Sequence, residues 1–237
     1  MKLIPRVLAV FLVIGLMLAC SAPSEAEGTG QATEQGRTAS KEHLASLVKK
    51  AEQGDVGAQH FLGLSYDLGR GVPQDYKQAV YWYTKAAEQG DASAQVSLGS
   101  MYDEGKGVPQ DYKQAVYWYT KAAEQGDASA QVCLGVMYAQ GLGVLQDYKQ
   151  AVYWYTKAAE QGKASAQYML GFRYCEGQGV LQDYAKAYAW WNLAASQGYK
   201  DARKNRDIIL GKMSPGQIEE GQKLSRELND KINSLAK

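Results

Sequence analysis

The chain has little of the side-chain chemistry on which metal sites and nucleic-acid binding depend. Its 237 residues include only two histidines and three cysteines. Neither His43 nor His60 belongs to a spaced set of Cys, His or carboxylate residues, so the sequence predicts no metal site and no cofactor. The 26 Lys and Arg residues nearly balance the 25 Asp and Glu residues. With no basic block, this balance argues against a nucleic-acid partner.

A catalytic motif is also lacking. Ser-x-x-Lys occurs at Ser46–Lys49 and Ser234–Lys237, but neither copy is joined by Ser-Asp-Asn or Lys-Thr-Gly. Gly-x-Gly-Val loops, such as the loop that starts at Gly69, have no Walker lysine and are better interpreted as turns than as phosphate-binding loops. We therefore expect no catalytic residue and no enzymatic activity.

The N-terminus carries the features of a bacterial targeting segment. Lys2 and Arg6 precede an apolar run, Val7–Leu18, that is shorter than the roughly 20 residues a membrane span needs. Met17–Cys20 resembles a lipobox, in which a peptidase cuts before the cysteine and a lipid is attached to its sulfur. We expect residues 1–19 to be a signal peptide and Cys20 to be lipidated. Cleavage by an ordinary signal peptidase is the main alternative, and an uncleaved anchor a lesser one.

The next segment, Ser21–Ser40, has no apolar side chain larger than alanine and predicts a disordered tether over residues 20–40. Lipid anchor and tether together indicate a protein of the cell envelope. In lipobox proteins, a serine in the place of Ser21 favours the outer membrane, so we expect the protein at its periplasmic face. Secretion and surface display are the alternatives.

An internal repeat dominates the rest of the chain. The 17 residues QDYKQAVYWYTKAAEQG recur letter for letter at Gln74–Gly90, Gln110–Gly126 and Gln146–Gly162, and a diverged copy occupies Gln182–Gly198. Because units repeating every 36 residues bury their apolar faces against their neighbours, this period predicts a solenoid. We expect an all-α fold with four helix-pair repeats over residues 55–198 and capping helices at 41–54 and 199–237.

Each repeat predicts two helices, which we call helix A and helix B. Helix A begins near Asp55, Asp91, Asp127 and Lys163. Helix B follows the N-cap residues Asp75, Asp111, Asp147 and Asp183, and the first three have Gln three residues later, as in a capping box. Glycines end both helices, and Ser214-Pro215 marks the start of a C-terminal capping helix.

The four A helices share one face and differ on the other. The positions of Ala58, Gln59, Leu62, Gly63 and Tyr66 are identical in all repeats and span about 140° of the helix, so they are predicted to pack. The remaining positions form what we call the variable face, and we predict that it binds the partner. Its residues are His60, Phe61, Leu64, Ser65, Val96, Ser97, Ser100, Met101, Val132, Cys133, Val136, Met137, Tyr168, Met169, Phe172 and Arg173. The alternative is that part of it packs inside a tightly wound superhelix.

Two cysteines, Cys133 and Cys175, lie within the repeats. They are 42 residues apart, which puts them at different helical phases of neighbouring repeats and makes a disulfide bond unfavourable. An oxidising compartment leaves the bridge open as an alternative.

The repeat resembles that of the Sel1-like family. The residues that carry the resemblance are Ala94, Leu98, Gly99, Tyr102, Gly105, Gly107, Val108, Asp111, Tyr112, Ala115, Trp118, Tyr119, Ala122 and Ala123. The resemblance implies an α/α superhelix whose A helices line a concave groove, and a non-catalytic scaffold or regulator that binds partner proteins there, most simply as a monomer. It leaves two other functions open. One is β-lactam hydrolysis or penicillin binding, described for cysteine-rich relatives whose cysteine pairs are missing here, and the other is binding of host proteins or glycans.

Overall fold

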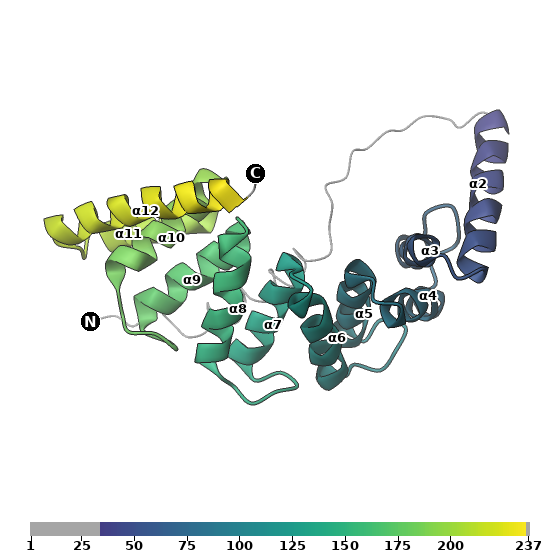
Figure 1. The fold of residues 1–237 in the computed structure, drawn as a ribbon, viewed down its shortest axis with the longest axis horizontal. Helices are drawn as coiled ribbons and strands as arrows, with labels where there is room; N and C mark the ends of the chain where they lie inside the picture. Colours follow the sequence, from purple (N-terminus) through teal and green to yellow (C-terminus); the bar gives the residue numbers. More distant parts are fainter. Residues whose placement is uncertain (1–33, 236–237) are drawn as a thin grey trace. The chain divides into compact units, whose positions relative to one another are not determined.

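The computed structural model describes residues 34–235, so the predicted signal peptide, Cys20 and most of the predicted tether lie outside the described residues. The described part consists of helices without strands, which confirms the all-α prediction (Figure 1). The chain divides within α2 into two units, residues 1–46 and 47–237, and the arrangement below concerns the second. The helices are α2 (Glu34–Glu52), α3 (Val56–Leu68), α4 (Tyr76–Glu88), α5 (Ala92–Glu104), α6 (Tyr112–Glu124), α7 (Ala128–Gln140), α8 (Tyr148–Glu160), α9 (Ala164–Glu176), α10 (Tyr184–Ser196), α11 (Lys200–Leu210) and α12 (Pro215–Leu235).

One predicted boundary is wrong. Residues 34–40 were expected in the disordered tether, but they form the first turns of α2, which runs unbroken to Glu52. The physical reason lies in composition: Glu34, Gln35, Arg37 and Ala39 are adequate helix formers, and extending an existing helix costs far less than nucleating one. The lack of large apolar residues in this segment therefore did not predict its conformation.

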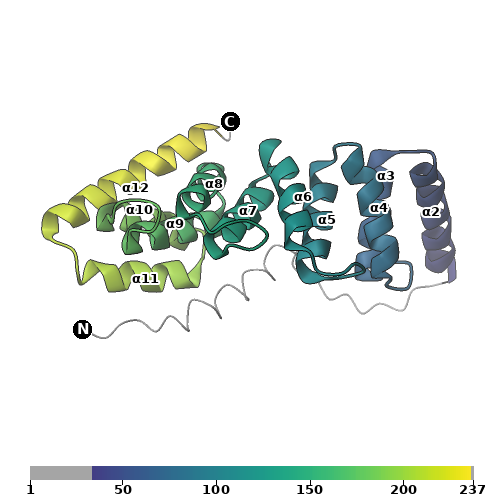
Figure 2. The same cartoon turned by 90° about the horizontal axis from the view of Figure 1, so that it is seen from below.

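The helices of the second unit form a succession of antiparallel pairs. Helices α3, α5, α7 and α9 are the A helices, and each packs on the B helix that follows it, α4, α6, α8 or α10. Each of the first three B helices then packs on the A helix of the next repeat, so the chain builds a solenoid one pair at a time (Figure 1). At the C-terminal end, α10 lies between α11 and α12 (Figure 2).

Aspartate side chains start most of the helices, as predicted. The Asp55 carboxylate accepts a hydrogen bond from the Ala58 N–H at 2.7 Å, and Asp75 accepts from the Lys77 and Gln78 N–H groups at 2.9 and 3.1 Å. The predicted capping box at α4 is not formed in its reciprocal half, because the Asp75 N–H donates to the Tyr66 carbonyl at 2.9 Å. That bond ties the start of helix B to the end of helix A in the same repeat.

Two sets of glycines allow close approach between elements. A Cβ on Gly135 of α7 would lie 2.5 Å from the Tyr155 ring, so the glycine lets helices A and B of one repeat touch. The second loop glycine acts between repeats. Gly143 has φ +69°, and a Cβ there would lie 2.3 Å from the Tyr112 carbonyl oxygen of the preceding repeat. The Gly-x-Gly loop is thus both a turn and an inter-repeat contact.

A ladder of buried glutamines links successive repeats. Gln95 of α5 donates from its amide to the Ala87 carbonyl of the preceding repeat at 3.1 Å and accepts from Gln125 at 2.8 Å. The same pair of bonds recurs for Gln131, which donates to the Ala123 carbonyl and accepts from Gln161. These bonds satisfy carbonyls at the end of one helix B and the polar group of the next helix A, which explains an invariant polar residue on a packing face.

The C-terminal cap begins as predicted. Gln217 donates its backbone N–H to the Ser214 hydroxyl at 3.3 Å, and the Ser214 N–H donates to the Gln217 side chain at 2.9 Å. Gly221 and Ser225 are buried on the seam with α10, whereas Leu235 at its end is 66% exposed. Within residues 34–235, none of the helices combines the length and the apolar character that a membrane crossing requires.

Candidate partner-binding face

The packing face predicted for the A helices is confirmed. Ala58, Gln59, Leu62 and Gly63 of α3 are buried, and their counterparts are buried in every repeat. These residues meet the alanines and tyrosines of the B helices. In the second repeat, for example, Leu98 lies in one core cluster with Tyr83, Ala86 and Ala87 of the preceding helix B.

The variable face, by contrast, is not uniformly accessible. At one extreme, Phe61 of the first repeat has 61% of its surface exposed. At the other, Met101 and Met137 are 3% and 1% exposed and belong to the core clusters. The buried members are Met101, Val132, Val136, Met137, Tyr168 and Met169. These six residues do not form open surface, which corrects the view of the face as one accessible strip.

Helical phase contributes to the burial of Met101 and Met137. The position shared by Ser65, Met101, Met137 and Arg173 lies only about 20° from the Ala58 position on the helix, so its side chain borders the packing face. In the second and third repeats a methionine there fills space between helix pairs. The ten remaining residues of the face are exposed or half-buried, namely His60, Phe61, Leu64, Ser65, Val96, Ser97, Ser100, Cys133, Phe172 and Arg173.

A polar cluster borders the variable face where the first two repeats meet. The Tyr83 hydroxyl donates to the Asp67 carboxylate at 3.3 Å, and burial raises the pKa of Asp67, while that hydrogen bond and the Lys106 charge oppose the shift. Lys106 pairs with Glu104 at 2.6 Å. Burial, together with the neighbouring Glu104 charge, raises the pKa of Asp103 to about 6. Neither Asp67 nor Asp103 was predicted from the sequence to be a functional residue.

Several Cys, His, Ser and Lys residues that the sequence offered for metal binding or catalysis lie within residues 34–235. Among the described residues there is no group of three His, Cys, Asp or Glu side chains that could hold a metal ion. Ser46 and Lys49 of the first Ser-x-x-Lys motif are both exposed on α2, and Ser234 donates to the Lys231 carbonyl of its own helix. Cys133 and Cys175 are not joined by a disulfide bond.

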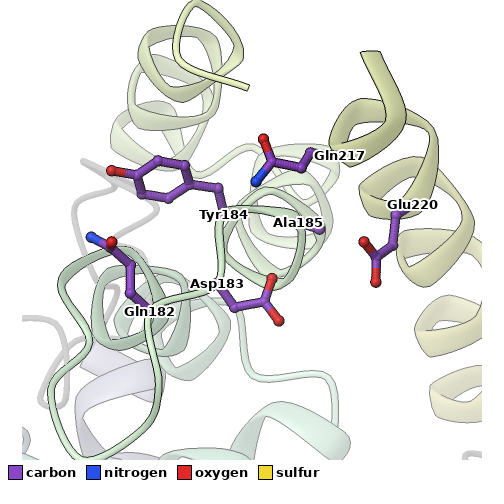
Figure 3. Close-up of a pocket in the computed structure, with 6 residues that line it drawn as sticks. All are labelled: Gln182, Asp183, Tyr184, Ala185, Gln217 and Glu220. Carbon is purple, nitrogen blue, oxygen red and sulfur yellow. The ribbon is translucent and has the colours of Figure 1, made fainter. Parts of the chain in front are cut away.

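A shallow cavity lies between α10 and α12. It has a volume of about 340 Å³ and is lined by Gln182, Asp183, Tyr184, Ala185, Gln217 and Glu220. The Asp183 and Glu220 side chains extend into the space between the two helices (Figure 3). Asp183 is already paired with Lys186 at 3.2 Å, and Glu220 also acts on that lysine to raise its pKa. These charges are satisfied within the protein, so the cavity is better explained as the seam of the C-terminal cap than as a ligand site.

Comparison with known proteins decides the family. A sequence model of the Sel1 repeat matches residues 56–91, 92–127, 128–163 and 164–199. The chain belongs to the Sel1 repeat family. Proteins built from Sel1 repeats are generally interaction scaffolds that bind other proteins and are typically not catalysts. No curated protein sequence matches the chain significantly.

Two solved structures show the same repeat at substantial identity. The Escherichia coli protein c5321, described as a protective antigen of uropathogenic strains, is 40% identical with a TM-score of 0.74, over 80% of this chain and 41% of its own. A Sel1 repeat protein from Oxalobacter formigenes is 39% identical with a TM-score of 0.65, over 72% of this chain and 50% of its own. This chain thus spans half or less of the length of each of these two relatives.

Proposed function

We propose that this Sel1 repeat protein is a non-catalytic scaffold or regulator of the bacterial cell envelope that binds a partner protein on the accessible part of its variable face. The observation that carries the proposal is the exposure of Phe61. A phenylalanine that is 61% exposed gains only part of the free energy that full burial would give, and it lies beside His60 and Leu64 on a surface that differs in every repeat. A specific partner would supply the missing apolar cover.

The chemistry of the face supports a protein as partner. Aromatic and aliphatic side chains, Phe61, Leu64 and Phe172, are interspersed with Ser97 and Ser100 and with the Arg173 cation. Aromatic and Arg residues are enriched where proteins contact one another, whereas a small-molecule site would need an enclosed cavity. The family's general role as an interaction scaffold agrees with this composition.

Photo-crosslinking tests the proposal directly. A photoreactive benzoylphenylalanine replaces Phe61 in one variant and Tyr117, which is 50% exposed on a B helix, in the matched control. We expect irradiation of living cells to yield a discrete protein adduct at position 61 and none at position 117. An adduct pattern that is the same at both positions, or none at either, would contradict the proposed face.

The predicted location in the cell envelope rests on the sequence around Cys20, which lies outside the described residues. We propose that the lipidated cysteine holds the protein at the periplasmic face of the outer membrane. The description of the Escherichia coli relative as an antigen supports an envelope location. Cys20→Ala is expected to abolish labelling with palmitate and to move the protein to the soluble fraction. A wild-type protein that takes up no lipid would favour ordinary secretion instead.

A further inference from the structure

The fourth repeat has a charged residue at a position that is buried in the second and third repeats. Arg173 stands where the second and third repeats have Met101 and Met137. Its guanidinium lies over the Tyr148 ring, 5.2 Å from the centroid, and over the Phe172 ring at 5.5 Å. One Nη donates to the Gln178 side-chain oxygen. Methionine at the equivalent sites shows that packing does not require the charge.

Arg173 has hydrogen-bonding capacity that the protein leaves unused. Its Nε is buried and has no hydrogen-bond partner within residues 34–235. None of the ion pairs that the described residues form includes Arg173, and the acceptor it does have, the Gln178 amide, is neutral. The lost hydration of this half-buried guanidinium is compensated only by the two aromatic rings and one neutral acceptor, and not by any carboxylate of residues 34–235.

The neighbouring Tyr155 has lost both of its potential partners through substitution. In the first repeat the equivalent Tyr83 hydroxyl donates to Asp67 and also interacts with Ser97. Around Tyr155, the position of Asp67 is occupied by Ala139 and that of Ser97 by Met169, and neither side chain can accept a hydrogen bond from the hydroxyl as Asp67 does.

The Tyr155 hydroxyl is consequently buried without a hydrogen-bond partner among the described side chains and backbone groups. Arg173 lies four residues after Met169 on α9, and therefore on the same side of that helix as the position from which Ser97 reaches the equivalent tyrosine. Burial raises the pKa of the Tyr155 hydroxyl, and the charge of Arg173 opposes the shift, which agrees with this placement. Two unused donors, Arg173 Nε and Tyr155 O–H, therefore lie near each other at the junction of the third and fourth repeats.

We propose that Arg173 and Tyr155 bind a carboxylate of the partner protein. The inference rests on the proposed function and names the chemistry that this end of the variable face recognises. Two parallel N–H donors of a guanidinium match the two oxygens of a carboxylate, which would replace the neutral Gln178 amide as acceptor. The contact requires the Arg173 side chain to shift from Gln178, because the Arg173 Nε and the Tyr155 hydroxyl are both buried in the free protein. In the free protein the guanidinium rests against the Tyr148 and Phe172 rings.

The experiment follows the Arg173 Nε–Hε resonance by NMR in the folded repeat protein. Arg173→Met assigns the resonance, and it keeps the fold because methionine occupies the equivalent site in two repeats. The probes are acetyl-Ala-Ala with a free C-terminal carboxylate, acetyl-glutamate amide with a side-chain carboxylate, and acetyl-Ala-Ala amide without either, at constant ionic strength in chloride. Inorganic phosphate serves as a further anion.

We expect a saturable shift with a carboxylate probe and none with the amide. The stronger of the two carboxylate arms identifies a chain terminus or an acidic side chain as the source. Tyr155→Phe is expected to weaken the binding roughly tenfold, because one hydrogen bond to the charged oxygen is lost.

A resonance that stays unmoved with both carboxylates, or that moves equally with phosphate, overturns the inference. The outcome is separable from that of the proposed function. If the adduct at position 61 forms while the resonance fails to respond, the face binds a partner without a carboxylate contact at Arg173. If the resonance responds but position 61 gives no adduct, the carboxylate site stands and the extent of the proposed face is wrong.

Discussion

The two helices of a repeat differ in how much they have changed between copies. In the first three repeats the B helices, Tyr76–Glu88, Tyr112–Glu124 and Tyr148–Glu160, are identical, whereas the A helices differ at most positions of one face. Each of these B helices packs on an A helix on either side, its own and the next, which restricts its alanines and tyrosines. Packing does not explain why Tyr81, Tyr117 and Tyr153, each 50% exposed, are also identical.

The A helices show that variation and exposure are different things. Phe61 and Met137 both belong to the face that varies, yet one is 61% exposed and the other 1%. A buried position tolerates change when neighbouring repeats adjust to the size of the side chain. Only the variation at accessible positions bears on partner choice.

The largest expected effect sharpens this contrast. Met137→Glu places a carboxylate in a core cluster with Tyr119 and Leu134 and is expected to cost about 3 to 5 kcal/mol of unfolding free energy. Phe61→Glu, on exposed surface, is expected to change it by less than about 0.5 kcal/mol. Urea denaturation followed by circular dichroism measures both. Equal losses in the two variants would show that the face is buried throughout.

Two loop glycines differ in whether a preceding repeat packs against them. Gly143 contacts the repeat before it, whereas Gly71 belongs to the first repeat. Gly71 and Gly143 both have positive φ, +78° and +69°, but only Gly143 faces a backbone oxygen, that of Tyr112. Gly143→Ala is expected to cost roughly 3 kcal/mol, and Gly71→Ala only about 1 to 2 kcal/mol from backbone strain. Thermal unfolding of the pair tests the difference. A larger loss for Gly71→Ala would contradict the inter-repeat contact.

The buried carboxyl of Asp103 is expected to make the stability of the protein depend on pH. Its folded-state pKa of about 6 lies above the value of about 3.9 for an unfolded chain. The folded protein therefore binds more protons between these values, and this carboxyl makes stability fall as pH rises from about 4 to about 6. Asp103→Asn is expected to remove that slope and to stabilise the protein at pH 7 by about 1 to 2 kcal/mol. Denaturation curves at pH 4 to 7 that run parallel for both proteins would refute it.

The smallest expected effect compares two equivalent tyrosines. Tyr83→Phe removes a hydrogen bond to Asp67 and should cost about 1 kcal/mol. Tyr155→Phe removes a buried hydroxyl that has no partner in the described part of the chain, so stability should stay unchanged or rise slightly. Chemical denaturation of the two variants side by side provides the test, and a greater loss at Tyr155 would contradict the assigned hydrogen bonding.

Much of the fold was predictable because the repeat provides an internal alignment. The period, the Asp N-caps and the invariant A-helix face were all visible in the sequence, and the structure confirms them. The helical phase of Met101 and Met137 puts them beside the packing face, but their burial was not predictable from it, since Ser65 and Arg173 share that phase and are only half-buried. The lack of a hydrogen-bond partner for Tyr155 among the described residues could not be predicted, because the partner positions lie on other helices. Ala139 and Met169 occupy them, as the equivalent contacts of Tyr83 in the structure show.

The central claim is that the accessible part of the variable face, and not the B helices, binds the partner. The most direct measurement is the dissociation constant of the partner identified by crosslinking, determined by calorimetry for the unmodified protein, Phe61→Glu and Tyr117→Glu. Both substitutions introduce the same charge at exposed aromatic residues. The account predicts at least about a tenfold loss of affinity for Phe61→Glu and no change for Tyr117→Glu. Unchanged affinity in Phe61→Glu together with a loss in Tyr117→Glu would contradict it.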